Sequence, residues 1–216
     1  MTKLFKIILL GDRSVGKTTS VRKYMDEKFA TNYSPTIGVD VTKIRVEFNN
    51  NSNKKNEKVN ITVWDIAGQE SFKNFRKTFY NGAIAGILMF DVTEKKSFNH
   101  IKDWLDEAQT EIGKQVPFIL VGNKIDLKRK RKIHLEEMKI LQQDQQNIKM
   151  IYETSAKTNK NIKELFISIA ETVLKGIVRD DKKKQLSVQS DQDIKSVVGK
   201  KVASARQLPT SLKRKS

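Results

Sequence analysis

The sequence alternates short apolar runs with longer segments in which apolar residues recur every three or four positions. The apolar or alternating runs predict six strands, at residues 3–10, 39–48, 59–64, 83–90, 118–121 and 150–153. The longer segments predict helices at residues 17–26, 97–112, 135–143 and 162–174. Because strands and helices alternate, we expect an α/β fold with a mostly parallel six-stranded sheet and helices on both faces.

Polar stretches separate some of these elements. Residues 29–38 form a polar, Pro-containing loop with little apolar material to bury, so we expect it to be mobile. Residues 49–58 read NNNSNKKNEK and predict an exposed hairpin loop. We interpret it as a tolerated surface insertion, in preference to a partner-binding element.

The pattern is lost beyond about Val178. We therefore expect a folded domain at residues 1–178 and a basic tail at residues 179–216. The tail is rich in Lys, Ser and Gln, and its few apolar residues are compatible with a short amphipathic helix. Disorder is the favoured prediction for it.

Composition narrows the classes of protein. The chain has 216 residues, which suits one domain with extensions, and no cysteine, which excludes disulfides, thiolate metal sites and a cysteine nucleophile. We find no signal peptide and no window long enough for a membrane span, so we expect a cytoplasmic protein. The net charge of +17 would attract polyanions, and much of it lies in the tail and in the KRKRK run at residues 128–132.

The first candidate site follows the first predicted strand. Its sequence GDRSVGKT, residues 11–18, matches the phosphate-binding loop G-x-x-x-x-G-K-[ST] and leads into a helix. Glycines allow the tight turn, successive backbone N–H groups and the helix N-terminus favour an anion, and the lysine and threonine suit phosphate and Mg²⁺. This motif predicts a P-loop NTPase in which the nucleotide contacts Gly11, Asp12, Arg13, Ser14, Val15, Gly16, Lys17, Thr18 and Thr19.

Two further segments supply groups for the terminal phosphate. Asp65 directly follows a predicted strand, and we expect its carboxylate to hold Mg²⁺ through a water. Gly68 can bring its backbone N–H to the γ-phosphate. Gln69 can orient an attacking water through its donor and its acceptor. Thr36, in the polar loop, could ligate Mg²⁺ while the γ-phosphate is present. We therefore expect Lys17, Gly68 and Gln69 to serve catalysis.

A third group of motifs fits a guanine base. In Asn123-Lys124-Ile125-Asp126, the Asp126 carboxylate can accept both N1–H and the 2-amino group of guanine, an edge that adenine lacks. In Ser155-Ala156-Lys157, the Ala156 N–H could face guanine O6. GTP and GDP are the expected nucleotides.

These five motifs, in this order, resemble those of the Ras-superfamily small GTPases over residues 3 to about 177, with most similarity to the Rab branch. Rab-like strings include IGVD at residues 37–40, FYNGA at residues 79–83 and LMFDVT at residues 88–93. The resemblance implies the small G-protein fold and slow GTP hydrolysis in a molecular switch. It also implies that Phe29 packs against the base and that Tyr33 covers the phosphates. Effector, exchange and activating proteins are then expected at Thr31–Asp40 and Ala67–Tyr80.

The family also forms an exposed apolar effector patch, to which Trp64 and an aromatic near Tyr80 would belong.

Three departures from the Rab pattern stand out. Val41 replaces a Phe, which weakens any inference about effectors. Arg13 replaces a small residue beside the γ-phosphate; obstruction of an activating arginine or an outward pose is favoured over direct catalysis. Rab proteins end in prenylated cysteines, and this sequence has none, so we expect any peripheral membrane contact to use the basic tail.

The leading hypothesis is thus a monomeric GTP-hydrolysing switch that changes its partner-binding loops with the nucleotide, in membrane or vesicle traffic. An alternative is a basic protein that binds nucleic acid or an anionic surface and keeps a GTP site for structure or control. No RNA-binding aromatic pattern accompanies the charge, so nucleic acid is not an expected partner. A third hypothesis is a GTP-binding scaffold that hardly hydrolyses because of Arg13.

Overall fold

The computed structural model describes residues 4–25, 36–50 and 55–176. The chain divides into two units, Met1–Leu174 and Lys175–Ser216. The sheet and the elements around it belong to the first unit. The predicted domain boundary at residue 178 lies outside the described residues, as does almost all of the tail.

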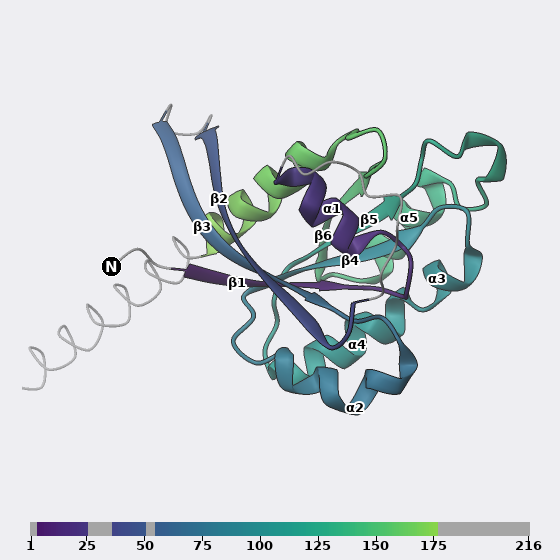
Figure 1. The fold of residues 1–216 in the computed structure, drawn as a ribbon, viewed down its shortest axis with the longest axis horizontal. Coiled ribbons are helices and arrows are strands. Elements are labelled where there is room, and N and C mark those ends of the chain that lie inside the picture. Colours follow the sequence, from purple (N-terminus) through teal and green to yellow (C-terminus); the bar gives the residue numbers. More distant parts are fainter. Residues whose placement is uncertain (1–3, 26–35, 51–54, 177–216) are drawn as a thin grey trace, which may run out of the picture. The chain divides into compact units, whose positions relative to one another are not determined.

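A six-stranded sheet forms the centre of the first unit, in the order β2-β3-β1-β4-β5-β6 (Figure 1). All neighbouring pairs are parallel except β2 and β3. The mostly parallel six-stranded sheet expected from the sequence is confirmed. The strands are β1 Leu4–Leu10, β2 Val39–Asn50, β3 Lys55–Ile66, β4 Ala85–Asp91, β5 Phe118–Asn123 and β6 Ile148–Glu153.

Helices follow most of the strands. The α-helices are α1 Lys17–Tyr24, α2 Lys73–Arg76, α3 Lys95–Asn99, α4 Ile101–Ile112 and α5 Leu135–Asp144, together with a last helix described over residues 162–176. Short 3-10 helices lie at Glu70–Phe72, Lys77–Phe79 and Lys128–Lys130.

The sheet is buried on both faces. Along β1, consecutive side chains alternate between the faces, so all of Ile7 to Leu10 are buried. Ile8 and Leu10 belong to the cluster that Trp104 and Leu105 of α4 complete. On the opposite face, α1 contacts the helix at residues 162–176, as the Tyr24 and Phe166 rings lie 4.4 Å apart. Helices thus cover both faces, as predicted (Figure 1).

This arrangement brings several loops to one edge of the sheet. Parallel strands end at the same edge, and the loops that follow β1, β3, β4, β5 and β6 therefore lie near one another. Every motif that the sequence analysis placed after a strand belongs to one of these loops.

The prediction of a loop at residues 49–58 is wrong in its extent. The antiparallel ladder of β2 and β3 continues through Phe48↔Glu57 and Asn49↔Asn56 to Asn50↔Lys55, so only residues 51–54 remain between the strands, outside the described residues. Ladder hydrogen bonds join backbone groups and need no apolar side chain, which is why a polar sequence can extend a hairpin. The two strands run on together beyond the rest of the sheet (Figure 1).

The helix predicted at residues 97–112 is also different, because it is divided into α3 and α4 at His100. His100 has ψ −5°, which opens the helical turn. Its N–H still donates to Lys96 O at 3.1 Å, and its carbonyl accepts from Trp104 N at 3.0 Å. Apolar spacing is maintained on both sides of this residue, so periodicity alone does not indicate the division.

Candidate nucleotide-binding site

The loop between β1 and α1 depends on its two glycines. Gly11 and Gly16 have φ of 138° and 105°, values that L-residues rarely adopt. A Cβ on Gly11 would lie 2.0 Å from Met89 O, and one on Gly16 would lie 2.2 Å from Asn123 Nδ2. The loop therefore packs so closely against β4 and β5 that no larger residue fits at either position.

Lys17, at the start of α1, is the cation of this loop. Its side chain is 7% exposed, and Nζ donates to Gly11 O at 2.7 Å and to Asp12 O at 2.9 Å. Burial lowers the pKa of Lys17 to about 8, although the charges of Asp65 and Asp12 oppose this shift. A phosphate anion at the loop would provide the counter-charge that this buried ammonium lacks.

Three oxygen-bearing side chains meet beside Lys17, from three different segments. Thr18 Oγ1 lies 2.8 Å from Thr36 Oγ1 and donates to Asp65 Oδ2. Asp65, at the end of β3, is 2% exposed, and burial raises its pKa while Lys17 opposes the shift. Its Oδ1 is buried and has no hydrogen-bond partner among the residues that the structure describes.

This donor set fits a hard cation. Two hydroxyl oxygens and a carboxylate with an unused oxygen are the ligand types that Mg²⁺ prefers, and Mg²⁺ usually binds with few protein ligands and several waters. The described residues contain no cluster of three or more His, Asp or Glu side chains suited to a metal. Thr18, Thr36 and Asp65 could hold the ion here, because their oxygen atoms meet at one point.

A hollow beside these groups is lined by many of the residues that we predicted to bind the phosphates. Gly68 lies against the phosphate-binding loop, since a Cβ there would be 2.3 Å from Gly11 O and 2.6 Å from Arg13 N. Gln69 follows Gly68, and Arg13 is exposed at the rim. The hollow is lined by Arg13, Ser14, Gly16, Lys17, Thr18, Thr19, Thr36, Ala67, Gly68 and Gln69.

Asp12 is oriented differently from the rest of the loop. Its backbone carbonyl faces Lys17, whereas its carboxylate faces α4. The carboxylate contacts Trp104 in α4 and His100, the residue before α4. Trp104 Nε1 donates to Asp12 Oδ1 at 2.8 Å, and His100 Nδ1 lies 2.8 Å from Oδ2. Trp104 is core, as expected, but its indole N–H also anchors the phosphate-binding loop.

Asn123, at the end of β5, joins three loops of the predicted base site. Its Nδ2 donates to Val15 O at 2.9 Å. Its Oδ1 accepts hydrogen bonds from Thr154 Oγ1 at 3.1 Å and from the Ala156 N–H at 3.2 Å. Asn123 thus fixes the loops after β1 and β6 relative to each other, and the contact of Ala156 with guanine O6 stays a prediction.

Asp126 and Lys124 are held by neighbouring loops. Ser155 Oγ donates to Asp126 Oδ1 at 2.6 Å, which orients the carboxylate. Lys124 has φ 68°, and its Nζ lies 2.7 Å from Asp91 Oδ2. Lys157 is exposed. Phe29 and Tyr33 lie outside the described residues, so their predicted contacts stay predictions.

Sequence reasoning missed the residues that support this site. Four residues without a predicted role make such contacts. Three of them bond to predicted site residues, namely Asp91, Thr154 and His100. The fourth, Glu153, forms an ion pair with Arg131 of the basic run at 2.7 Å. Only Asp91 gave a signal, since it is the one polar residue that ends the buried strand β4. The others act through contacts between residues distant in the sequence.

Apolar side chains are exposed near the β2 edge of the sheet. Ile37 is 81% exposed, and Val41 and Phe75 are about half exposed. The Phe79 ring lies 6.1 Å from that of Trp64 and 5.1 Å from that of Phe75. Tyr80 itself is fully buried, whereas Phe75 is exposed and Phe79 is half-buried. The effector patch implied by the resemblance stays a prediction.

Comparison with known proteins agrees with the geometry. The Ras family model matches residues 6–175. Ras-related protein Rab-13 of Rattus norvegicus is 36% identical over 171 residues, covering 79% of this chain and 80% of the relative. Ras-related protein RABE1e of Arabidopsis thaliana is 35% identical over 181 residues, covering 83% and 79% respectively.

These relatives support the hypothesis of a GTP-hydrolysing switch and give no support to that of a nucleic-acid-binding protein with an accessory GTP site. Ras-family GTPases bind guanine nucleotide, generally with Mg²⁺, and Rab-like members interact with effector, exchange and activating proteins. Among the described residues, no helix is both long and apolar enough to cross a membrane. The chain belongs to the Ras family and is a Rab-like small GTPase.

Proposed function

We propose that the hollow at the strand ends binds the phosphates of GTP with Mg²⁺, and that the adjoining loops after β5 and β6 bind guanine. The observation that supports this best is the meeting of Thr18, Thr36 and Asp65 around a buried carboxylate oxygen that has no partner within the described part of the chain. A buried polar atom without a partner is costly, and an ion or its water shell would satisfy it.

Hydrolysis then needs positioning and charge, without a covalent intermediate. Lys17 holds the β- and γ-phosphates through its ammonium, and the Gly68 N–H donates to the γ-phosphate. The Gln69 side chain accepts a hydrogen bond from the attacking water and orients it. Thr18, Thr36 and Asp65 would hold Mg²⁺, which would supply positive charge against the charge that develops on the phosphate oxygens.

Base selection rests on Asp126. Its carboxylate, oriented by Ser155, accepts N1–H and the 2-amino group of guanine, and adenine would leave it unsatisfied. Replacing Asp126 by Ala should weaken GDP binding by at least about a hundredfold. The same change should leave the weak binding of ADP within about threefold, which nucleotide titration would measure. Equal losses for both nucleotides would contradict base selection by Asp126.

The reaction itself is tested by the nucleotide that co-purifies with the chain. We expect that nucleotide to be GDP or GTP. In the presence of Mg²⁺ the chain should release phosphate from GTP slowly, at roughly 10⁻⁴ to 10⁻³ per second, the range of the intrinsic hydrolysis rate of Ras. Co-purifying adenine nucleotide would contradict the proposal.

The variant Arg13→Gly separates the roles left open for Arg13. Slower hydrolysis indicates a catalytic arginine, and an unchanged or faster rate excludes one.

We place partner binding on Thr31–Asp40 and Ala67–Tyr80, which include Thr36 and Gly68. Loss of the γ-phosphate would release both segments and change the surface around Ile37 and Phe75. Membrane or vesicle traffic is the process that suits the Rab-like relatives, with residues 179–216 contacting an anionic surface through their Lys and Arg side chains.

A further inference from the structure

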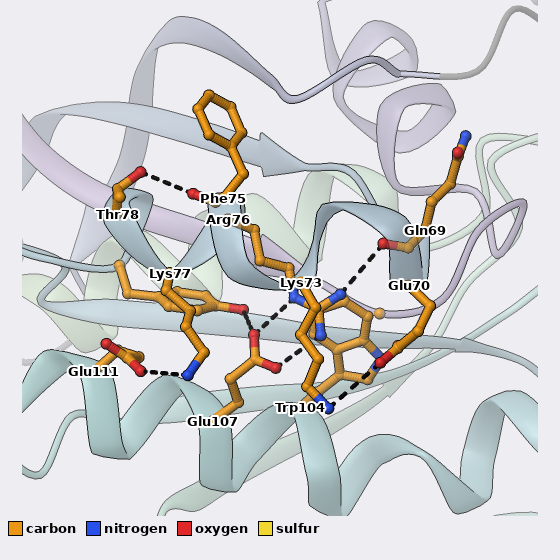
Figure 2. A network of polar contacts seen from close by, with 12 residues as sticks. Gln69, Glu70, Lys73, Phe75, Arg76, Lys77, Thr78, Trp104, Glu107 and Glu111 are labelled. Atoms are coloured by element: carbon orange, nitrogen blue, oxygen red, sulfur yellow. Dashed lines mark hydrogen bonds and ion pairs between the residues drawn. The ribbon is translucent and has the colours of Figure 1, made fainter.

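The 67–80 segment contains a buried arginine that the proposed reaction does not yet use. Arg76 is 4% exposed, and its Nε and Nη2 each lie 2.7 Å from one oxygen of Glu107 on α4. Tyr80 Oη donates to the same carboxylate at 2.6 Å. Figure 2 shows the Glu107 carboxylate facing the Arg76 guanidinium.

The Arg76 guanidinium has a second support in α4. Its central carbon lies 3.9 Å from the centre of the Trp104 ring, a cation–π geometry. Trp104 in turn donates to Asp12 Oδ1 in the phosphate-binding loop. One residue of α4 therefore contacts both the phosphate-binding loop and the 67–80 segment.

The third donor of Arg76 reaches the residue that we assign to the attacking water. Arg76 Nη1 donates to the backbone carbonyl of Gln69 at 3.4 Å (Figure 2). In the same view the Gln69 side chain extends away from the polar network, and Gln69 lines the hollow with Lys17 and Thr36. Arg76 thus contacts the Gln69 backbone while leaving its amide available.

Arg76 and Glu107 each favour the charged form of the other. Burial opposes the charge of Arg76, but the hydrogen bonds and the charge of Glu107 raise its pKa above the ordinary value. For Glu107, hydrogen bonds from Arg76 and Tyr80 outweigh burial and lower the pKa. A planar guanidinium can serve three acceptors at once, which a lysine ammonium on a flexible chain cannot do with the same geometry.

Attachment of the 67–80 segment to α4 does not by itself require a buried arginine. The neighbouring pair of Lys77 and Glu111, at 3.0 Å and partly exposed, already joins the segment to α4. Buried ion pairs are often replaceable by apolar residues without loss of stability, so stability alone does not account for Arg76.

We propose that Arg76 is a positioning residue for GTP hydrolysis, which holds the Gln69 backbone against α4 so that the Gln69 amide faces the phosphate hollow. The inference rests on the proposed role of Gln69 in hydrolysis. Glu107 and Trp104 hold the guanidinium in place, and Arg76 does not belong to the lining of the phosphate hollow.

The test is a double-mutant cycle on the full chain, read by single-turnover hydrolysis of bound GTP. Arg76→Met should slow hydrolysis by about tenfold, as loss of one orienting contact in an active site does. In a Gln69→Leu background the same change should alter the rate by less than about twofold, because Arg76 acts through Gln69. Dissociation of a fluorescent GDP analogue should change by less than about threefold, since Arg76 does not line the phosphate hollow.

Two further variants separate positioning from folding. Glu111→Gln breaks the neighbouring ion pair to α4 and should leave hydrolysis within about twofold of the parent rate. Arg76→Lys keeps the charge beside Glu107 but loses the simultaneous bond to Gln69 O, so it should stay folded by thermal melting and still hydrolyse GTP several times more slowly, by about fivefold. It replaces Arg76→Met as the decisive variant if the latter does not fold.

The outcomes distinguish two failures. If Gln69→Leu slows hydrolysis but Arg76→Lys and Arg76→Met react at the parent rate, the positioning role is overturned and the proposed function stands. If Gln69→Leu itself has no effect, the role of Gln69 fails, and positioning through it fails too. Slowing by Arg76→Met that persists in full in the Gln69→Leu background would also overturn the inference.

Discussion

Two backbone carbonyls, of Gly11 and Asp12, accept the hydrogen bonds of the buried Lys17 ammonium. Neither carbonyl carries a full charge, so burial dominates and lowers the pKa from 10.5 to about 8. Such a shift means that burial disfavours the charged form by about 3 kcal/mol relative to water. A bound phosphate would oppose this effect, which makes the protonation of Lys17 a direct report of nucleotide binding.

The first prediction follows from this lysine. Without nucleotide, the folded chain binds fewer protons than the unfolded chain between pH 8 and 10.5, so its free energy of unfolding should rise with pH in that window. With GDP bound, the pKa of Lys17 should rise above about 10 because the phosphates supply negative charge. Chemical shifts of the Lys17 side-chain carbons measured against pH would give both values, with Lys17→Arg used for assignment. A pKa near 10.5 in both states would contradict the account of Lys17.

Residue patterns also mark the limit of what the sequence predicted. The spacing of Gly11, Gly16 and Lys17 follows from the chemistry of a phosphate loop and could be read directly. The contacts of Arg76 with Glu107 could not, because each is an ordinary surface residue type and the two are 31 positions apart. Burial of a paired charge depends on tertiary packing, which a local pattern does not encode.

At the scale of elements, β1 and β4 were predicted closely because most of their residues are apolar and each forms a short run bounded by polar or turn-forming residues. The β2–β3 hairpin was not, because its outer part is polar and pairs only through the backbone. Its inner part is different: Phe48 and Val59 are buried. The outer pairs at Asn49 and Asn50 are therefore separable from the core.

The second prediction concerns that outer part. Deleting residues 49–56 and joining Phe48 to Glu57 by Asn-Gly, a turn suited to a two-residue hairpin, should leave GDP affinity unchanged. It should shift the melting temperature by no more than about 4 °C, the size expected for about 1 kcal/mol in a chain of this length.

As a control, Phe48→Ala in the full chain removes buried apolar surface and should cost about 3 kcal/mol or more. Thermal melting and GDP titration of both variants would check the comparison. A trimmed hairpin that lowered stability as much as Phe48→Ala would show that the outer part supports the fold.

At the scale of the whole molecule, charge is unevenly distributed along the chain. From residue 182 to 216, ten Lys and Arg accompany only Asp191 and Asp193. Each basic residue near an anionic surface contributes about 1 kcal/mol, and salt screens this attraction within about a nanometre. This charge supports the proposal that the tail attaches reversibly to an anionic membrane.

The third prediction tests this attachment. The full chain should float with vesicles that contain anionic lipid, and the bound fraction should fall as salt is raised from about 0.05 to 0.5 M. Truncation after residue 178 should abolish flotation, whereas vesicles of neutral lipid should bind neither form. Flotation that survives truncation would exclude the tail as the membrane contact.

The central claim is that the terminal phosphate of a guanine nucleotide sets the conformation of two segments, residues 36–40 and 67–80. Amide hydrogen exchange, measured on the same preparation loaded with GDP or with a non-hydrolysable GTP analogue in Mg²⁺, tests it most directly. The account predicts slower exchange in both segments with the GTP analogue and unchanged exchange in β4 and β5. Equal exchange in both segments with the two nucleotides would contradict it.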